Sequence, residues 1–167
     1  MPGKNLKILD GDPLVVRAIK QIKQIDRIDR ILVSTDSRGI AEVAISAGAE
    51  VPFMRPSELA EDDSPEWEVW RHAVTYLKEV EGDCPDLLMV VPPTAPLRSK
   101  DDLESILDEY ERGQADIVIT VTDDHRSPYF NQVKIGDLGL ASLAIHPKTS
   151  ITRRQDTPEI FDVTPGK

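Results

Sequence analysis

The stretch 87–102, LLMVVPPTAPLRSKDD, runs from an apolar segment directly into a loop with three prolines in five positions. Residues 86–91 are apolar on both faces, which is the pattern of a strand buried in a parallel sheet. Proline fixes φ, has no backbone N–H and pushes the preceding residue toward extended geometry. Residues 92–98 therefore form a stiff loop, with Thr94 as its hydroxyl group, that loses little entropy on binding a ligand. The alternative is a rigid connector, although about two residues are enough for that purpose.

Helix signals and strand signals alternate along the chain. Apolar spacing, caps and glycine stops predict helices over 11–25, 39–48, 64–80 and 99–113. Apolar or β-rich runs predict strands over 30–36, 86–91 and 115–124, an extended arm or strand over 49–55, and two strands around a Gly-Asp-Leu-Gly turn within 129–145. This alternation predicts an α/β, Rossmann-like three-layer fold with a mostly parallel sheet.

Two details of the helices can be predicted as well. Asp12 is expected to cap the first helix, with Pro13 at its first position. In the third helix, one apolar stripe is expected in the core, and it consists of Trp67, Trp70, Val74 and Leu77. No buried strand precedes the first helix, whereas doubly wound folds normally begin with a central strand.

Composition narrows the class of protein. The 167 residues predict one domain, 1–167, and the formal net charge of −10 argues against binding nucleic acid or an anionic membrane. A local basic cluster can still bind an anionic ligand. Cys84 is the single cysteine, so neither an internal disulfide nor a cysteine zinc site is expected. No apolar run reaches about 18 residues and no signal peptide is apparent, which favours a cytoplasmic protein.

Several chemistries lack their sequence patterns. His72, His125 and His146 show no metal-binding spacing, and there is no nucleophile elbow, GxGxxG motif or P-loop lysine. Ligands of open α/β sheets bind outside the carboxyl ends of the strands. This rule selects four loops, namely 34–36, 55–57, 92–98 and 122–126.

Each polar candidate has a functional and a plain interpretation. Asp36 could contact a sugar, a metal or a base edge, or it could cap the next helix. Arg55 could hold a phosphate or a base, and Asp62 and Asp63 could lie beside a metal or simply be solvated. The pair Arg153–Arg154 suits a carboxylate or a phosphate, or is an exposed, solubilising pair.

Four segments occur in a characteristic order, PGKN (2–5), ILVSTDSRGIAEVAISAGAEVPFMRPSELAEDDSP (31–65), PPTAPLR (92–98) and RRQD (153–156). With these spacings the chain resembles the acylneuraminate cytidylyltransferases, the CMP-sialic acid synthetase family, whose relatives act on legionaminic, pseudaminic and other acidic sugars. The resemblance implies a nucleotide-diphospho-sugar transferase fold. It also implies a reaction of CTP with a nine-carbon α-keto acid sugar, giving a CMP-sugar and pyrophosphate with Mg²⁺, and a homodimer.

Matching positions carry implied roles. For the nucleotide, the resemblance implies contacts from Lys4, Asn5, Arg55, Ser64, Pro93 and Thr94. For the sugar, it implies contacts from Asp36, Thr94, Arg98, Arg154 and Gln155. Lys4 near the triphosphate and Arg154 near the sugar carboxylate are the implied catalytic residues. The chain departs from the family's QPTSPLR at Pro92 and Ala95, which favours a different acidic sugar or weaker binding.

The resemblance also implies that the chain is cut at both ends. The family's first strand, most of its phosphate loop and its metal-binding aspartates would lie outside, so no metal ligand is expected within this chain. The gap between 30–36 and 86–91 predicts a chain that is weakly stable, rearranged there or filled by another chain. Two alternatives to the enzyme remain: an inactive fragment with a partial nucleotide pocket and a subunit interface, and an octulosonate-type cytidylyltransferase.

Overall fold

The computed structural model describes residues 3–61, 63–113, 115–123, 126–129, 131–137, 139–148, 151 and 153–164, without the side chains of Arg154 and Thr164. The chain divides into two compact units, Met1–Asp116 with Pro165–Lys167, and Ile117–Thr164. The single domain predicted for residues 1–167 stays a prediction.

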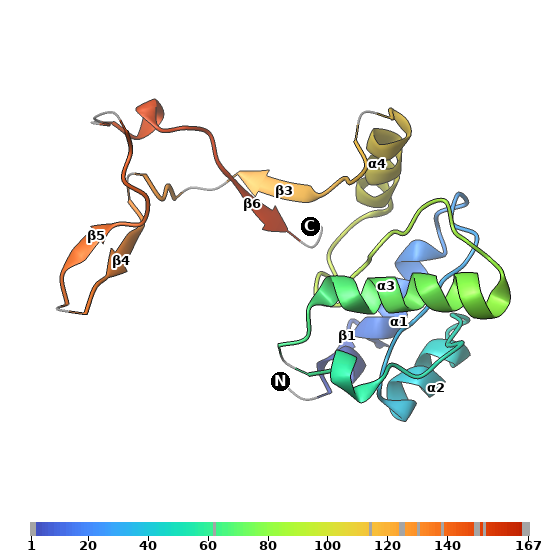
Figure 1. Ribbon diagram of the computed structural model, residues 1–167. Coiled ribbons are helices and arrows are strands. Elements are labelled where there is room, and N and C mark those ends of the chain that lie inside the picture. The colour runs from blue at the N-terminus through green and yellow to red at the C-terminus, as the bar shows by residue number, and fades with distance from the viewer. Residues whose placement is uncertain are drawn as a thin grey trace. The chain divides into compact units, whose positions relative to one another are not determined.

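Four helices dominate the first unit (Figure 1), and all four were predicted. They are α1 (Leu14–Ile22), α2 (Arg38–Ser46), α3 (Glu66–Tyr76) and α4 (Lys100–Glu111). Their ends follow local signals: Ser99 and Asp102 form a capping box at the start of α4. Gly48 follows α2 with φ 82°, a left-handed conformation that glycine adopts without steric cost. A π-helical turn, Leu77–Glu81, continues α3.

The start of α1 differs from the prediction. Pro13, not Asp12, is the capping residue, and the cap makes no side-chain hydrogen bond. Asp12 instead belongs to a short hairpin of β1 (Ile8–Leu9) and β2 (Asp12–Pro13), and its carboxylate lies 2.7 Å from Lys20 Nζ. The hairpin turns at Asp10 and Gly11, both at positive φ, which is the Asp-Gly turn that suits a two-residue loop.

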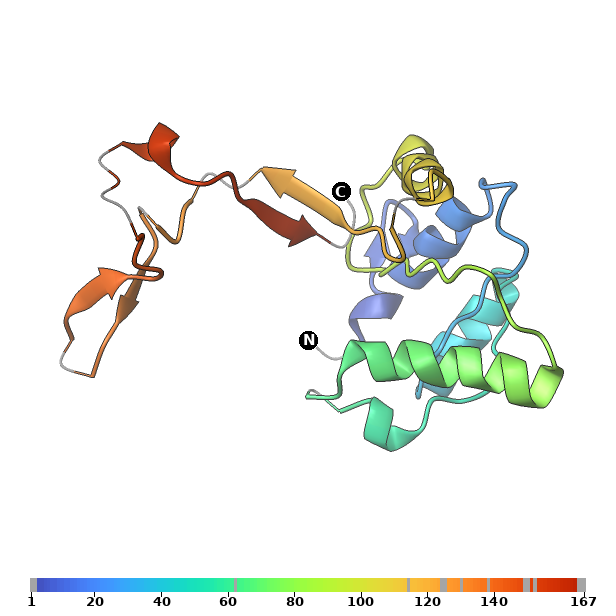
Figure 2. The same cartoon turned by 45° about the horizontal axis from the view of Figure 1, so that its top comes forward.

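The first unit has two small cores. In the first, Val15 and Ile19 of α1 pack with Ala44 and Ala49. In the second, Ile25, which lies just after α1, packs with two buried residues of α4, Leu103 and Leu107, and partly buried Met89 and Val91 lie against them. Figures 1 and 2 both show α1 between α2 and α4, and α1 contacts each of them. Helix packing therefore accounts for the order of this unit.

The chain has mixed helix and strand, but the predicted parallel sheet is not confirmed. Among the described residues, the one parallel pairing is the single bridge between Leu32 and Glu50. Residues 86–91 form no strand, and Leu87, Leu88 and Val90 are 37–47% exposed. An extended segment buries its second face only when a neighbouring strand or layer covers it, so the gap expected beside 86–91 agrees with this exposure.

The core prediction for α3 is wrong at its two tryptophans. Trp67 is 50% exposed and Trp70 37% exposed, whereas Leu77, at the end of the stripe, is buried. The periodicity is helical as expected, but an apolar stripe becomes core only where a partner layer covers it. Here the helix contacts the preceding chain through Phe53, whose ring lies 4.7 Å from the His72 ring and 4.9 Å from the Tyr76 ring.

The second unit consists of two strand pairs. β3 (Thr120–Asp123) pairs antiparallel with β6 (Phe161–Thr164), and β4 (Val133–Ile135) pairs antiparallel with β5 (Ala141–Leu143). The second pair confirms the two strands predicted around the Gly-Asp-Leu-Gly turn. The strand predicted over 115–124 is shorter than expected, and it is antiparallel rather than part of a parallel sheet.

Candidate functional site

The proline loop, residues 92–98, is closed on itself by Arg98. Its guanidinium donates to the Pro92 carbonyl, and the Ala95 amide donates to the same oxygen at 3.3 Å. Arg98 is 4% exposed, and burial lowers the pKa of its guanidinium. The Thr94 side chain is exposed at the turn. The loop thus presents Thr94 to solvent, while Arg98 acts within the loop and its sugar contact stays a prediction.

Two residues of α1 hold this loop, and sequence reasoning missed them. Arg17 Nε donates to the Pro96 carbonyl at 3.0 Å. Gln21 Nε2 donates to the same oxygen at 3.0 Å and to the Arg98 carbonyl at 2.8 Å. Their i, i+4 spacing places both residues on one side of a helix, but it does not show what that side contacts, so the sequence alone carries no signal for these bonds.

Arg55 joins two of the four predicted loops. Its Nε donates to Ser34 Oγ at 3.1 Å, its Nη2 donates to the Ser34 carbonyl, and its backbone amide donates to Thr35 at 2.9 Å. Burial lowers the pKa of the guanidinium, while the carboxylates of Asp36 and Glu66 act in the opposite direction. An arginine side chain stays protonated in proteins, so Arg55 is a partly buried cation that its bonds to Ser34 hold in place.

Asp36 lies exposed beside this cation and does not cap α2. Ser37 is the capping residue, and its hydroxyl accepts from the Ile40 amide at 3.4 Å. The plain interpretation of Asp36, a helix cap, is therefore wrong, and its carboxylate remains available to a polar ligand. Its contact with a sugar stays a prediction.

Ser64 shapes the loop that precedes α3. Its hydroxyl donates to the Glu58 carbonyl at 2.8 Å and accepts from the Glu61 amide at 3.2 Å. These bonds close the segment that contains the 3₁₀ turn Ser57–Leu59. Asp62 lies outside the described residues, and Asp63 is exposed. Ser64 thus orders the loop that follows Arg55 in the sequence, and its contact with the nucleotide stays a prediction.

The segment with Lys4 and Asn5 forms a 3₁₀ turn, Lys4–Leu6, against the first core. Leu6 packs on that core, and Lys4 is exposed. The Asn5 Oδ1 atom is buried and accepts no hydrogen bond from the described part of the chain. An acceptor without a donor costs free energy, so this amide is suited to a donor from a ligand or from water.

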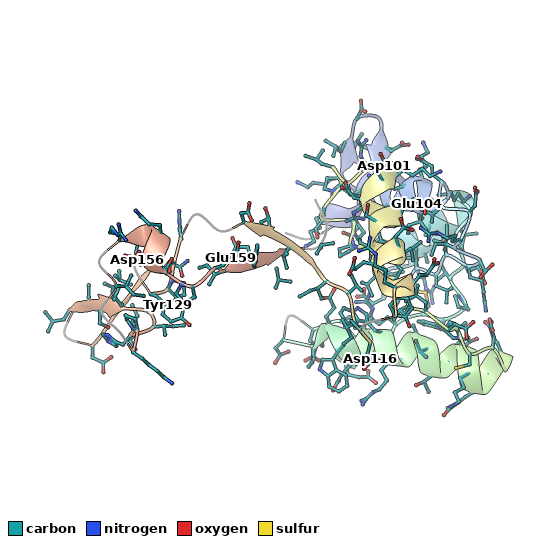
Figure 3. The ribbon with its side chains drawn as sticks, turned by 90° about the horizontal axis from the view of Figure 1, so that it is seen from above. Asp101, Glu104, Asp116, Tyr129, Asp156 and Glu159 are labelled. Carbon is teal, nitrogen blue, oxygen red and sulfur yellow. The ribbon has the colours of Figure 1, made fainter. Side chains whose placement is uncertain are left out.

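The remaining candidates belong to the second unit. Gln155 is exposed in the 3₁₀ turn Arg154–Asp156. The neighbouring Arg153 makes a bidentate pair with Asp156, at 3.0 and 2.9 Å, and Figure 3 labels Asp156 at this turn. The Arg154 side chain lies outside the described residues. The meeting of this turn with the loops of the first unit stays a prediction.

The described residues contain no ready-made ligand cluster for Mg²⁺. Nowhere in the described ranges do three His, Cys, Asp or Glu side chains gather as a ligand set. Mg²⁺ is commonly held by one or two carboxylates together with substrate phosphates and water, and the described part of this chain shows no protein cage for it. No catalytic step is therefore assigned to a metal here.

The sequence pattern of the cytidylyltransferase family matches residues 1–139. The chain belongs to the cytidylyltransferase family. It is 30% identical over 160 residues to post-translational flagellin modification protein B of Campylobacter coli, covering 96% of the chain and 67% of that protein. It is 32% identical over 103 residues to a Legionella pneumophila protein, CMP-N,N'-diacetyllegionaminic acid synthase, covering 62% of the chain and 44% of that protein.

A Campylobacter jejuni protein of the latter name is 30% identical over 160 residues, covering 96% of the chain and 67% of that protein. The chain thus spans about two thirds of the Campylobacter proteins and less than half of the Legionella protein. These findings confirm the predicted family and an enzyme of the cytidylyltransferase type. In the described part of the chain, no helix is long and apolar enough to cross a bilayer.

Proposed function

We propose that the chain takes part in the transfer of CMP from CTP to an acidic nine-carbon keto sugar, with release of pyrophosphate. The observation that carries this is the family match over residues 1–139, together with relatives named for CMP-N,N'-diacetyllegionaminic acid synthesis. The fixed cation at Arg55 and the rigid loop with exposed Thr94 support it. Both are features that a nucleotide and a polyhydroxylated sugar can use.

In the proposed reaction the anomeric hydroxyl of the sugar attacks the α-phosphorus of CTP. The hydroxyl gives its proton to a base or to solvent, a new P–O bond forms to the α-phosphorus, and the bond to the pyrophosphate oxygen breaks, so that pyrophosphate leaves with that electron pair. Such chemistry depends on position and on positive charge near the phosphates. Lys4 is proposed to face the triphosphate and Arg154 the sugar carboxylate, with Asn5, Arg55, Ser64 and Pro93 around the nucleotide, and Asp36, Thr94, Arg98 and Gln155 toward the sugar.

The proposal includes Mg²⁺, which would offset the charge of the leaving pyrophosphate, but the described residues contain no ligand set for it. A homodimer and a cytoplasmic location belong to the proposal as well. Light scattering of the purified protein tests the first, and cell fractionation tests the second. A monomer at micromolar concentration would contradict the homodimer.

The preferred sugar is the finer part of the proposal. Pro92 and Ala95 lack the amide and hydroxyl found in the resembling QPTSPLR loop, so two polar contacts to the sugar are lost. A hydroxyl or amide contact in a dry site contributes about 1–3 kcal/mol to discrimination, and its loss favours a sugar with a less polar group at that place. Legionaminic-type sugars, named for two of the relatives, are the first to test.

The experiment incubates the protein with CTP, Mg²⁺ and a panel of acidic sugars, and follows pyrophosphate. The panel contains sialic, legionaminic and pseudaminic acids, with an eight-carbon octulosonic acid as the competing substrate class. We expect release with a nine-carbon sugar. Release with the octulosonic acid alone supports the octulosonate alternative, and release with none contradicts the proposed reaction for this chain.

Arg154→Ala tests the proposed sugar contact within the same assay. We expect a rise of roughly tenfold or more in the KM for the sugar, because a charged hydrogen bond to a carboxylate is lost. The KM for CTP should be unchanged. Arg153→Ala is the matched control, since the Arg153 guanidinium is already paired with Asp156. Equal KM values for the two variants would remove the role of Arg154.

A further inference from the structure

The proline loop has more hydrogen-bond acceptors than donors. Pro92, Pro93 and Pro96 have no backbone N–H, yet each keeps its carbonyl oxygen. A carbonyl removed from water without a donor costs free energy. The Pro92 oxygen accepts from within the loop, whereas the Pro96 and Arg98 oxygens accept from elsewhere in the protein. The identity of these donors therefore determines where the loop is held.

The donors come from one side of α1. Arg17 and Gln21 are one turn apart, and both donate to the Pro96 carbonyl at 3.0 Å. Gln21 also donates to the Arg98 carbonyl at 2.8 Å, and all three bonds are partly buried. Gln21 is oriented by this double donation, which leaves its Oε1 atom buried and without a hydrogen-bond donor in the described structure. The Oε1 atom is left without a donor because the Gln21 amide group is turned so that its Nε2 donates to both loop carbonyls.

Arg17 connects the loop to the N-terminal segment as well. Its Nη1 lies 3.7 Å from Asp10 Oδ2, at the turn of the β1–β2 hairpin. This hairpin directly follows the turn with Lys4 and Asn5. Arg17 thus contacts both the proline loop and the hairpin that follows the Lys4–Leu6 turn.

We propose that Arg17 and Gln21 are positioning residues, which hold the proline loop and the N-terminal segment in the relative arrangement that nucleotide and sugar require. This inference rests on the proposed function and deepens it. Neither residue touches a substrate; each acts through the carbonyl oxygens of the loop. Thr94, exposed on the same loop, is the group whose place they determine.

Gln21→Glu is the sharpest test, because it keeps the shape of the side chain and replaces two donated protons with acceptors that repel the loop carbonyls. Gln24→Glu is the matched control: Gln24 is exposed just beyond α1 and donates only to the Lys20 carbonyl at 3.3 Å. Gln21→Met, an apolar residue of similar size, separates a lost bond from an added charge. For Arg17, the pair is Arg17→Met and Arg17→Lys, which keeps one donor.

Two measurements are made on the full chain. Hydrogen exchange reports the loop amides of Thr94, Ala95 and Leu97, and we expect faster exchange in Gln21→Glu than in Gln24→Glu. Steady-state kinetics with CTP and the acidic sugar should show a fall of roughly tenfold in kcat/KM, with KM affected, since misplacement of reacting groups on the order of 1 Å has effects of this size or larger. Arg17→Lys should recover part of the loss seen in Arg17→Met.

The outcomes are distinct. Unchanged loop exchange in Gln21→Glu overturns the proposal, and so does faster exchange with unchanged kinetics. A fall in kcat alone that matches the fraction of unfolded protein, measured by urea titration, indicates a merely structural role and also overturns the proposal. If the unsubstituted protein neither binds CTP nor releases pyrophosphate, the proposed function itself fails and the positioning role falls with it. If the unsubstituted protein is active and the variants match Gln24→Glu, only the positioning role falls.

Discussion

The four helices of the first unit and the two apolar strands expected over 86–91 and 115–124 are predicted by equally clear patterns, yet they differ in the structure. The four helices form within a few residues of the predicted ranges, although Pro13 replaces Asp12 as the capping residue of α1. The apolar runs were expected in a buried sheet, but Leu88 is 47% exposed and Ile117 77% exposed. A helix satisfies its backbone within itself, whereas a strand needs a neighbour. Apolar periodicity therefore predicts helices more reliably than it predicts burial of strands.

The largest expected difference comes from the same substitution made in both regions. Leu103→Ala removes a side chain that is 2% exposed in α4, and should lower the free energy of unfolding by about 2–5 kcal/mol. Leu88→Ala removes a side chain from the nearby exposed run and should cost about 1 kcal/mol or less. Urea titration of both variants measures the contrast. Equal losses would mean that the run 87–91 is buried in solution, for example against another chain.

The helix boundaries could be predicted because their signals are local. Ser99 with Asp102 at the start of α4, Gly48 after α2 and Gly113 after α4 each act within a few residues of the helix boundary that they set. Strand pairing could not be predicted on the same basis, because an extended segment such as 86–91 needs a neighbouring strand that its own residues do not specify. Burial of Trp67 and Trp70 likewise depends on a covering layer that the periodicity of α3 does not specify.

The residues of the candidate site show the same contrast: some are selected by the sequence, and others are found only through tertiary contacts. The strand-end rule selects the loops 34–36, 55–57 and 92–98, and the resemblance assigns roles within them. In the structure Arg55 bonds to Ser34, while the parallel sheet on which the rule depends is not confirmed. The bonds from Arg17 and Gln21 to that loop depend on tertiary placement of carbonyl oxygens, which no spacing in the sequence reports. Asp36 was considered as a cap because it precedes α2, but Ser37, one residue later, has the extended geometry of a cap.

A smaller effect tests whether the local signals of α4 act as described. Ser99→Ala should lower the free energy of unfolding by about 1 kcal/mol at pH 7, the usual cost of losing a cap. Hydrogen bonds from Ser99 lower the pKa of Asp102 below its usual value of about 3.9. The contribution of Asp102 is therefore present above pH ~4 and is lost as the pH falls through the lower, folded-state pKa.

Asp102→Asn checks this pH dependence. Its stability deficit at pH 7 should shrink as the pH falls below about 4, where the carboxyl group of the unsubstituted protein takes up a proton. Urea titrations between pH 3 and pH 7 measure the change. Asp101→Asn, on the same turn but outside the capping box, is the control (Figure 3). A deficit that stays constant with pH would contradict the capping role of the carboxylate.

The smallest expected effect concerns the ion pairs of Arg30, which join segments that are far apart in the sequence. Arg30 contacts Glu50 at 2.5 Å, Glu81 at 2.8 Å and Asp83 at 2.9 Å, so one guanidinium joins the Leu32–Glu50 bridge to the end of α3. Its hydrogen bond to Glu50 lowers the pKa of that carboxyl group.

Because these partners are largely solvated, Arg30→Gln should lower the free energy of unfolding by only about 1 kcal/mol or less. The loss should diminish between low salt and roughly 0.5 M salt, where screening weakens the attraction. Arg112→Gln, which loses one exposed pair within its own helical segment, should have no measurable effect. A salt-independent loss at Arg30 would mean that the guanidinium acts by packing rather than by charge.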